Sequence, residues 1–200
     1  MTQEKIQRHN QRMKRHKEIV DQKIAQADIE RGIIIVITGN GKGKTTSALG
    51  TLLRSLGHGQ HCVLGQFIKG QWDCGEDHFF AQTDNLSHYT MNTGFTWNTQ
   101  DFEQDKQAAQ LIWQQLLPHF NDPQQRLIVL DEITYMFKYH YLDLQEFIRV
   151  IKNRPEQQNI IISGRGAPTE LLELADTVSE IKPVKHAFNQ GIKAQQGIEW

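Results

Sequence analysis

The stretch Thr38-Gly39-Asn40-Gly41-Lys42-Gly43-Lys44-Thr45-Thr46 decides the fold of this chain. It follows the apolar run Ile33 to Ile37 and precedes a segment whose apolar residues recur at helical spacing, Ala48, Leu49, Leu52, Leu53 and Leu56. This order predicts a strand, a phosphate-binding loop and a helix. Glycines let successive backbone N–H groups point at one anion, and the helix N-terminus and Lys44 add positive charge. We therefore expect a polyphosphate at this loop.

The loop differs from the usual phosphate-loop formula at one position. The formula G-x-x-x-x-G-K-[ST] begins with glycine, whereas this chain has Thr38 there. Asn40 and Lys42 make the loop unusually polar and cationic. A glycine-rich turn without a ligand is the alternative, but the flanking strand and helix favour a nucleotide site. We expect nucleotide binding by Gly39, Asn40, Gly41, Lys42, Gly43, Lys44, Thr45 and Thr46.

Length and composition limit the architecture and the partners. The 200 residues suit one α/β domain with a short appendage, and a formal net charge of −1 argues against a nucleic-acid partner held by overall basic charge. Cys62 and Cys74 are too few for a disulfide framework and lack the paired spacing of a zinc site. No apolar run approaches the roughly 18 residues of a membrane span, and a signal-peptide core is lacking. We therefore expect a cytoplasmic protein with neither a membrane nor a nucleic-acid partner.

Residues 1–31 are predicted to form a helical arm distinct from the phosphate-loop domain, residues 32–200. The arm is rich in Gln, Lys, Arg and His, and its apolar stripe is sparse, at Ile6, Met13, Val20, Ile24 and Ala27. Such a helix cannot bury much surface by itself. Its basic cluster, residues 12–17, is either a nucleic-acid contact or a solvated face. We expect the arm to dock on a partner subunit or on the edge of the active site.

Apolar runs and helical patterns alternate through the rest of the chain. The alternation predicts a mainly parallel sheet with helices on both faces, an α/β fold of the P-loop NTPase-like (RecA-like) type. Further strands are expected at 62–68, 87–91, 127–130, 159–163 and 178–181. Helices are expected at 44–57, 76–82, 101–117, 133–138, 143–154 and 168–175. Thr99 is the expected cap of the helix over 101–117, with Asp101 in its first turn.

The apolar run Leu127 to Leu130 ends in two carboxylates, Asp131 and Glu132. A buried strand that ends in acid after an earlier phosphate loop is typical of the second nucleotide motif, in which a carboxylate meets Mg²⁺ beside the phosphates. We expect Asp131, Glu132 and Thr45 to form the metal site. Because side chains alternate along a strand, one of the two carboxylates should face the phosphates and the other should face elsewhere. The alternative is a buried strand that ends in solvated acids.

Three further segments are candidates for ligand contact. Residues 67–72 leave the carboxyl end of the second strand, where ligands bind in open α/β sheets. Phe95 and Trp97 lie in a polar, glycine-containing stretch, and the residues alone leave open whether they are functional or plug the surface. Arg165 follows another buried strand, where it either contacts phosphate or sits in a plain turn.

Motif chemistry indicates a magnesium-nucleotide enzyme or an ATP-driven machine and leaves four outcomes open. These are phosphoryl transfer to a small substrate, hydrolysis coupled to motion, nucleotide switching, and attack on the nucleotide away from the γ-phosphorus. A kinase should supply a base or a positioned acceptor and usually an Arg-bearing lid, and a motor should show a partner surface. Neither feature is evident in the sequence. A conventional ATPase or small-molecule kinase remains the alternative function.

Several segments together resemble the P-loop corrinoid adenosyltransferases, nearly end to end. They are the phosphate loop, Gln66-Phe67-Ile68-Lys69-Gly70, Thr93-Gly94-Phe95-Thr96-Trp97, Val129-Leu130-Asp131-Glu132-Ile133-Thr134-Tyr135, Pro183-Val184-Lys185-His186-Ala187-Phe188 and Lys193-Ala194-Gln195. The resemblance implies transfer of the 5′-deoxyadenosyl group of ATP to the Co(I) centre of a reduced corrinoid, with release of tripolyphosphate. It also implies Mg²⁺, a homodimer, and a reduced flavin or flavoprotein as electron donor.

The resemblance also implies roles for particular residues. Phe95 and Trp97 would press against the lower face of the corrin and displace its lower ligand, which eases reduction of the cobalt. Glu132 is the first candidate for contact with magnesium or ribose, and Asp131 is the second. Lys185 and His186 match a family motif to which we assign no role. Charge on the leaving triphosphate would be stabilised by Lys42, Lys44, Thr45, Thr46 and the loop N–H groups, with Lys44 acting catalytically.

Overall fold

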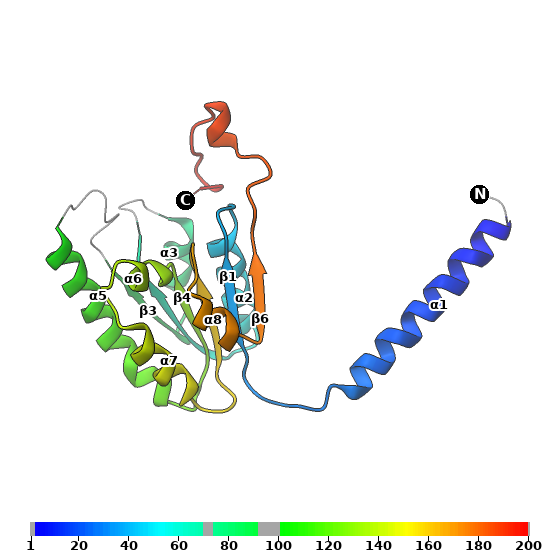
Figure 1. Cartoon of the computed structure of the whole chain (residues 1–200), viewed down its shortest axis with the longest axis horizontal. Helices are drawn as coiled ribbons and strands as arrows, with labels where there is room; N and C mark the ends of the chain where they lie inside the picture. Colours follow the sequence, from blue (N-terminus) through cyan, green and yellow to red (C-terminus); the bar gives the residue numbers. More distant parts are fainter. Residues whose placement is uncertain (1–2, 70–73, 92–100, 200) are drawn as a thin grey trace. The chain divides into compact units, whose positions relative to one another are not determined.

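The computed structural model describes residues 3–69, 74–91 and 101–199 (Figure 1). The backbone divides into two units, Met1–Arg31 and Gly32–Trp200. The first unit contains helix α1 (Gln3–Gln26), none of whose residues is buried. In the part of the chain that the structure describes, no helix is long and apolar enough to cross a membrane. The predicted phosphate loop and the acid strand both lie in the second unit.

The second unit is built on one parallel sheet of six strands. They are β1 (Ile34–Thr38), β2 (His61–Gln66), β3 (Leu86–Thr90), β4 (Gln125–Asp131), β5 (Asn159–Ser163) and β6 (Thr177–Glu180). Their order across the sheet is β3-β2-β4-β5-β1-β6, and every pair is parallel. All six carboxyl ends therefore share one edge. β5 lies between β1 and β4, so one strand separates the phosphate-loop strand from the acid strand.

Helices cover both faces of this sheet, as predicted (Figure 1). Side chains of α2 (Lys44–Gly57) and α3 (Gly75–Phe80) share one core with Leu127, Val129 and Ile161. The other core contains Ile128 and Ile160 together with side chains from α5 (Phe102–Leu116), α6 (Thr134–Lys138), α7 (Leu144–Lys152) and α8 (Thr169–Leu174). Successive residues of β4 and β5 thus enter opposite cores, as the two-residue repeat of a strand requires. The described residues also form short 3₁₀ helices at Leu117–Asn121 and Ala187–Gln190.

Several expected boundaries differ by one or two residues in the structure, and two of the differences have a clear physical reason. Asp101 caps α5, because its carboxylate accepts a 3.1 Å hydrogen bond from the Gln104 N–H, and so it precedes the first turn. The expected cap, Thr99, lies outside the described residues. β2 ends at Gln66 and does not reach Ile68, because its neighbour β4 ends opposite it at Asp131.

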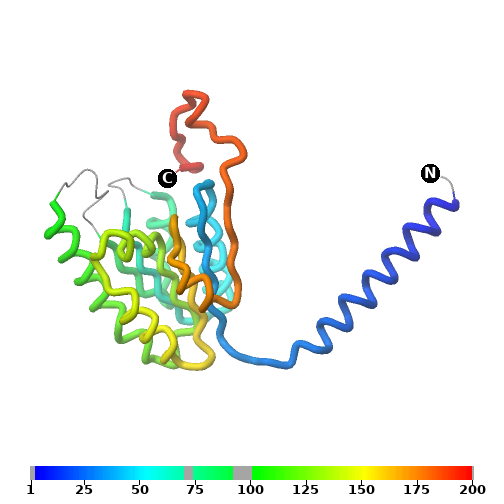
Figure 2. The backbone as a smooth tube through the Cα atoms, in the orientation of Figure 1, coloured from blue at the N-terminus to red at the C-terminus, as the bar shows by residue number. Residues whose placement is uncertain are grey.

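Ile181, directly after β6, holds the phosphate loop in place. Its N–H donates to the Thr38 carbonyl (2.8 Å), and its carbonyl accepts from the Gly41 N–H (2.8 Å). Gly39, between these contacts, has φ +100°, and a Cβ there would overlap the Ile181 carbonyl oxygen. Only glycine adopts this backbone conformation without strain. Figure 2 shows the C-terminal segment, in red, continuing from β6 past the loop end of β1.

Replacing Gly39 by alanine should therefore destabilise the protein. The left-handed backbone alone costs a non-glycine residue about 1–2 kcal/mol, and overlap with Ile181 adds to this cost. The matched control is Gly50→Ala inside α2, where a new Cβ meets nothing within 4 Å. That variant should be more stable than wild type by up to about 1 kcal/mol. Urea denaturation measures both, and a Gly39→Ala protein as stable as wild type would contradict the account of the loop.

Candidate active site

The phosphate loop joins the buried end of β1 to the first turn of α2, at the carboxyl edge of the sheet. Thr38, at the start of the loop, is buried, and its hydroxyl accepts a 3.3 Å hydrogen bond from the Ala167 N–H. Gly43, with φ +120°, directly precedes the first residue of α2. The Gly41 N–H is bonded to Ile181, so in this structure it does not point at a ligand. The helix N-terminus nevertheless leaves the end of the loop suited to an anion.

Lys44 is a buried cation held against its own loop. Its side chain is 5% exposed, and its Nζ donates to the Gly41 carbonyl at 3.0 Å. Burial lowers the pKa of Lys44, and the charge of Arg165 acts in the same direction. The negative charges of Glu132 and Asp131 oppose this lowering. Lys44 therefore lies within electrostatic reach of both carboxylates that the sequence singled out.

Asp131 is the centre of the site. The residue is 3% exposed, and its carboxylate accepts hydrogen bonds from the hydroxyls of Thr45 (3.1 Å) and Ser163. Thr45 and Asp131 are 86 residues apart in sequence. Burial raises the pKa of Asp131, while hydrogen bonds from Ser163, Thr45 and Gln66 favour the ionised form. The structure thus brings together two of the three predicted metal-site residues.

Glu132 does not continue the strand, which corrects the expectation that the two carboxylates alternate along it. Its φ of +58° is left-handed, and β4 ends one residue earlier. This turn is held by the Glu132 N–H, which donates to the Ser163 hydroxyl at 3.1 Å. Burial first, and the Asp131 charge second, raise the pKa of Glu132 to about 7. Lys44 and Arg165 oppose the rise, so Arg165 acts electrostatically on the site.

Ser163 is a site residue that the sequence reasoning missed. It is fully buried at the end of β5, where its hydroxyl donates to Asp131 and accepts from the Glu132 backbone. The signal was a hydroxyl residue closing the apolar run 160–162, in a strand that proved to lie between the phosphate-loop strand and the acid strand. The contacts of Ser163 follow from the strand order, which the sequence alone does not give.

The carboxyl edge offers oxygen donors that fit Mg²⁺. Asp131 and Thr45 are in contact, and the Oε2 atom of Glu132 is buried without a hydrogen-bond partner among the described residues. Mg²⁺ prefers oxygen ligands and usually takes one or two carboxylates, with phosphates and waters as the remainder. Within residues 3–69, 74–91 and 101–199, no cluster of three or more His, Cys, Asp or Glu could hold a metal alone. This donor set therefore suits a metal that arrives with a polyphosphate.

Other predicted residues are placed less centrally. Lys42 is exposed and forms a 2.5 Å ion pair with Glu199 near the C-terminus. Lys185 and His186 lie in the segment after β6, where His186 Nδ1 accepts from the Phe188 N–H at 3.2 Å. Phe95 and Trp97 lie outside the described residues.

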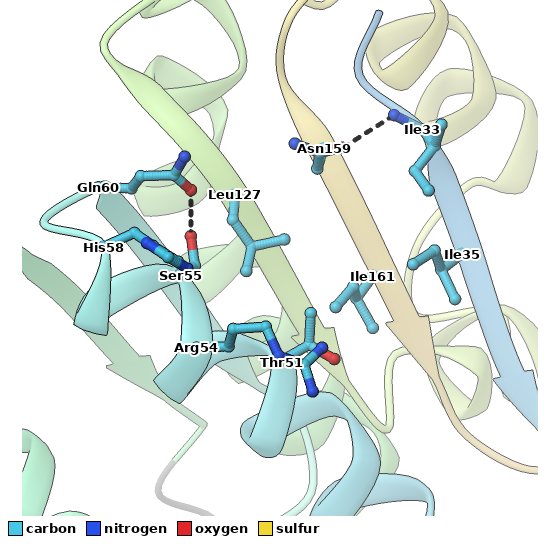
Figure 3. A pocket seen from close by; sticks show the side chains of 10 residues that line it. All are labelled: Ile33, Ile35, Thr51, Arg54, Ser55, His58, Gln60, Leu127, Asn159 and Ile161. Carbon is cyan, nitrogen blue, oxygen red and sulfur yellow. Dashed lines mark hydrogen bonds between the residues drawn. The ribbon is translucent and has the colours of Figure 1, made fainter. Parts of the chain in front are cut away.

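A cavity of ≈ 260 Å³ lies at the opposite edge of the sheet (Figure 3). Its walls include Ile33, Leu127 and Asn159, which stand near the amino ends of their strands, and the second half of α2. Ser55 Oγ donates to Gln60 Oε1 at 2.6 Å beside it. The phosphate loop and Asp131 are at the carboxyl edge, so this cavity lies away from the predicted nucleotide site.

These features define a P-loop nucleotide-binding protein of the α/β class, with one strand between its loop strand and its acid strand. Comparison with known proteins then names the family. The family model described as ATP:corrinoid adenosyltransferase BtuR/CobO/CobP matches residues 30–200, and one described as Cob(I)alamin adenosyltransferase N terminal matches residues 1–24. The chain belongs to the ATP:corrinoid adenosyltransferase family.

Curated relatives match along nearly their whole length. The corrinoid adenosyltransferase of Escherichia coli and that of Salmonella typhimurium are each 50% identical over 194 residues, covering 97% of this chain and 98% of theirs. The corrinoid adenosyltransferase of Pseudomonas aeruginosa is 46% identical and covers 98% of both chains. Among solved structures, the Hef helicase domain of Pyrococcus furiosus covers 88% of this chain and 40% of its own at 13% identity, with a TM-score of 0.43, too weak a likeness to support an argument.

In the metal-free protein, Glu132→Gln should abolish a pH-dependent loss of stability. The folded pKa of about 7 lies above the ordinary value of 4.5, so between these values the folded state binds more protons than the unfolded state. The free energy of unfolding of wild type should therefore fall as the pH rises through this range. Relative to wild type, Glu132→Gln should gain on the order of 2 kcal/mol between about pH 5 and about pH 8.

Urea denaturation in EDTA at a series of pH values measures this difference. Glu173→Gln, which replaces an exposed carboxylate on α8, is the matched control and should track wild type. A Glu132→Gln difference that stays constant across the series would show that Glu132 titrates as it does in the unfolded chain.

Proposed function

We propose that this protein transfers the 5′-deoxyadenosyl group of ATP to the Co(I) centre of a reduced corrinoid, releasing tripolyphosphate and forming an adenosylcobalamin-type cofactor. The observation that carries the proposal is the 50% sequence identity, over nearly the full length, to curated corrinoid adenosyltransferases. The P-loop beside a buried, hydrogen-bonded Asp131 supports the use of ATP.

The reaction requires little acid–base catalysis by the protein. Co(I) is itself a strong nucleophile: its electron pair forms the cobalt–carbon bond, and the bond between the 5′ carbon and the triphosphate oxygen breaks. The electrons of the broken bond leave on tripolyphosphate. The protein has to hold the 5′ carbon in line and stabilise the negative charge that builds up on the leaving group. A general base is not needed.

Lys44 is the residue best placed to stabilise the negative charge on the leaving tripolyphosphate. Its ammonium is buried, where a charge interaction is stronger than in water, and it is already aimed along the loop toward the Gly41 carbonyl. We propose that Lys44 binds the phosphates together with the other loop residues, Gly39, Asn40, Gly41, Lys42, Gly43, Thr45 and Thr46. For Gly41 and Lys42 this requires release of their present partners, Ile181 and Glu199.

Thr45, Asp131 and Glu132 are the residues that would hold Mg²⁺. Magnesium, when bound, spreads the negative charge of the triphosphate over an additional cation. The protein's own contribution is to orient Asp131 through hydrogen bonds from Thr45 and Ser163, which also oppose the rise in its pKa that burial causes. Glu132, with its pKa near neutrality, would gain most from a nearby cation.

The remaining assignments come from the family. We propose that Phe95 and Trp97 displace the lower ligand of the corrinoid, and that the arm, residues 1–31, is a separate segment that closes over the bound corrinoid. We further propose a cytoplasmic homodimer that receives electrons from a reduced flavin or flavoprotein. A match of residues 1–24 to the family's N-terminal model supports a shared role for the arm.

The reaction products test the proposal. The protein is incubated with ATP, Mg²⁺ and chemically reduced cobalamin, and phosphorus-containing products and the visible spectrum are followed together. Tripolyphosphate in step with a light-sensitive alkylcobalt spectrum is the expected result. ADP as the nucleotide product, with no change at cobalt, would instead identify a conventional ATPase or kinase.

The double variant Phe95→Ala with Trp97→Ala tests the corrin side of the site. If these rings displace the lower ligand, activity that starts from Co(II) with a reductant should fall roughly tenfold or more beyond any loss from pre-reduced Co(I), which corresponds to about 1.4 kcal/mol. Both activities are measured on the same preparation. Equal losses in the two assays would contradict ligand displacement.

A further inference from the structure

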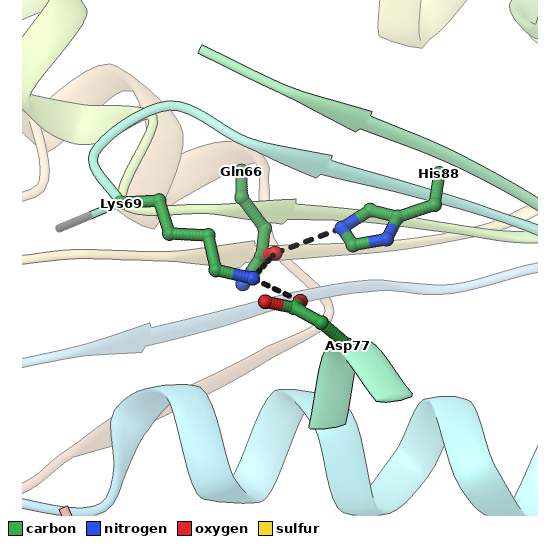
Figure 4. Close-up of polar contacts among 4 residues, drawn as sticks. All are labelled: Gln66, Lys69, Asp77 and His88. Atoms are coloured by element: carbon green, nitrogen blue, oxygen red, sulfur yellow. Dashed lines mark hydrogen bonds and ion pairs between the residues drawn. The ribbon is translucent and has the colours of Figure 1, made fainter. Parts of the chain in front are cut away.

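A polar cluster stands beside the site, made of Gln66, Lys69, Asp77 and His88 (Figure 4). Gln66 is the last residue of β2 and is 7% exposed. Its Oε1 accepts two hydrogen bonds, from His88 Nε2 at 2.8 Å and from Lys69 Nζ at 3.2 Å. Lys69 Nζ also forms an ion pair with Asp77 Oδ1, on α3. Lys69 and His88 thus both bind the Gln66 amide oxygen, and Asp77 in turn binds Lys69.

These partners fix which way the Gln66 amide points. A lysine ammonium only donates hydrogen bonds, so the atom of Gln66 that faces Lys69 is the oxygen. The amide nitrogen then faces the other way, and its N–H₂ group lowers the pKa of Asp131, the residue paired with Gln66 across β2 and β4. A flipped amide would set its N–H₂ against the Lys69 ammonium and its oxygen against the Asp131 carboxylate. Both contacts would be repulsive, so Lys69 and His88 hold the productive orientation.

Gln66 and Asp131 are also neighbours in the sheet. They are paired in the register of β2 and β4, and each is the last residue of its strand. Gln66 and Ser163 therefore approach the Asp131 carboxylate from the two adjacent strands, and Thr45 approaches it from α2. Only Thr45 belongs to the phosphate loop. Gln66 and Ser163 can therefore hold the carboxylate even if the phosphate loop changes conformation.

We propose that Gln66 is a positioning residue of the nucleotide site: clamped by Lys69 and His88, it orients the buried Asp131 carboxylate toward Thr45. The inference rests on the proposed function, because it takes Asp131 and Thr45 to serve magnesium and ATP. A buried carboxylate needs several hydrogen-bond donors, and loss of one donor lets it rotate. Gln66 touches neither nucleotide nor cobalt in this scheme and acts through Asp131.

Gln66→Glu is the sharpest test, because it keeps the shape of the side chain and replaces the donor that faces Asp131 by an oxygen. The dissociation constant of ATP is measured by titration calorimetry, once with Mg²⁺ and once with EDTA. With Mg²⁺, binding should weaken roughly tenfold or more, the effect of losing a hydrogen bond to a charged group. In EDTA the change should be clearly smaller, because the loop and Lys44 are untouched.

Gln125→Glu is the matched control. It lies at the opposite end of β4, where its Nε2 donates to Asp122 Oδ2 at 3.2 Å, so the same substitution again places a carboxylate beside a carboxylate. This variant should bind ATP as wild type does under both conditions. Gln66→Met, which removes the donor without adding charge, replaces Gln66→Glu if the latter does not fold, and should shift binding in the same direction.

The outcomes are separable from those of the proposed function. If wild type fails to bind ATP with Mg²⁺, the proposed function falls, and this inference falls with it. If wild type binds but the Gln66 variants bind equally well, or weaken by the same factor with Mg²⁺ and in EDTA, Gln66 has only a structural role and this inference alone is overturned.

Discussion

A buried carboxylate that must stay hydrogen-bonded is the constraint on which this site depends. Asp131 is 3% exposed, and an ionised group at such a depth is stable only if donors replace the water it has lost. The donors come from three places in the chain: the Thr45 hydroxyl at the start of α2, the Ser163 hydroxyl at the end of β5, and the Gln66 amide at the end of β2. The strand order β2-β4-β5-β1 brings these segments to one point. The strand order that defines the fold therefore also assembles the site.

The phosphate loop is constrained from the other side by the end of β6. Ile181 bonds to Thr38 and to Gly41 through its own backbone, so the loop conformation depends on a strand 140 residues or so further along the chain. A loop that departs from the common formula at Thr38 is thus held by contacts from outside the loop. The Thr38 hydroxyl accepts from the Ala167 N–H, a contact that glycine would not make. The Gly41 N–H donates to Ile181, the residue that follows β6, so nucleotide binding has to compete with Ile181 for this N–H.

Local sequence patterns predicted the parts of this protein that depend on interactions between residues close in sequence. The apolar runs, the phosphate loop and the acid-ended strand were recognisable from residue order, and the parallel sheet with helices on both faces followed from their alternation. Contacts between distant segments were not recognisable. The left-handed turn at Glu132 depends on Ser163, and the orientation of the Gln66 amide depends in part on His88, and neither contact is marked by spacing in the sequence. The roles of Phe95 and Trp97 rest on family resemblance alone.

We infer that ATP loses its triphosphate whole because the site binds the triphosphate and presents the ribose to cobalt. A crystal structure of the protein with ATP, Mg²⁺ and a corrinoid would show which part of the nucleotide faces the cobalt. We expect the triphosphate against Lys44 and Thr45, with the 5′ carbon of the ribose facing the cobalt in line for attack. A nucleotide whose ribose methylene points away from the cobalt, with its γ-phosphate exposed to an acceptor, would contradict it.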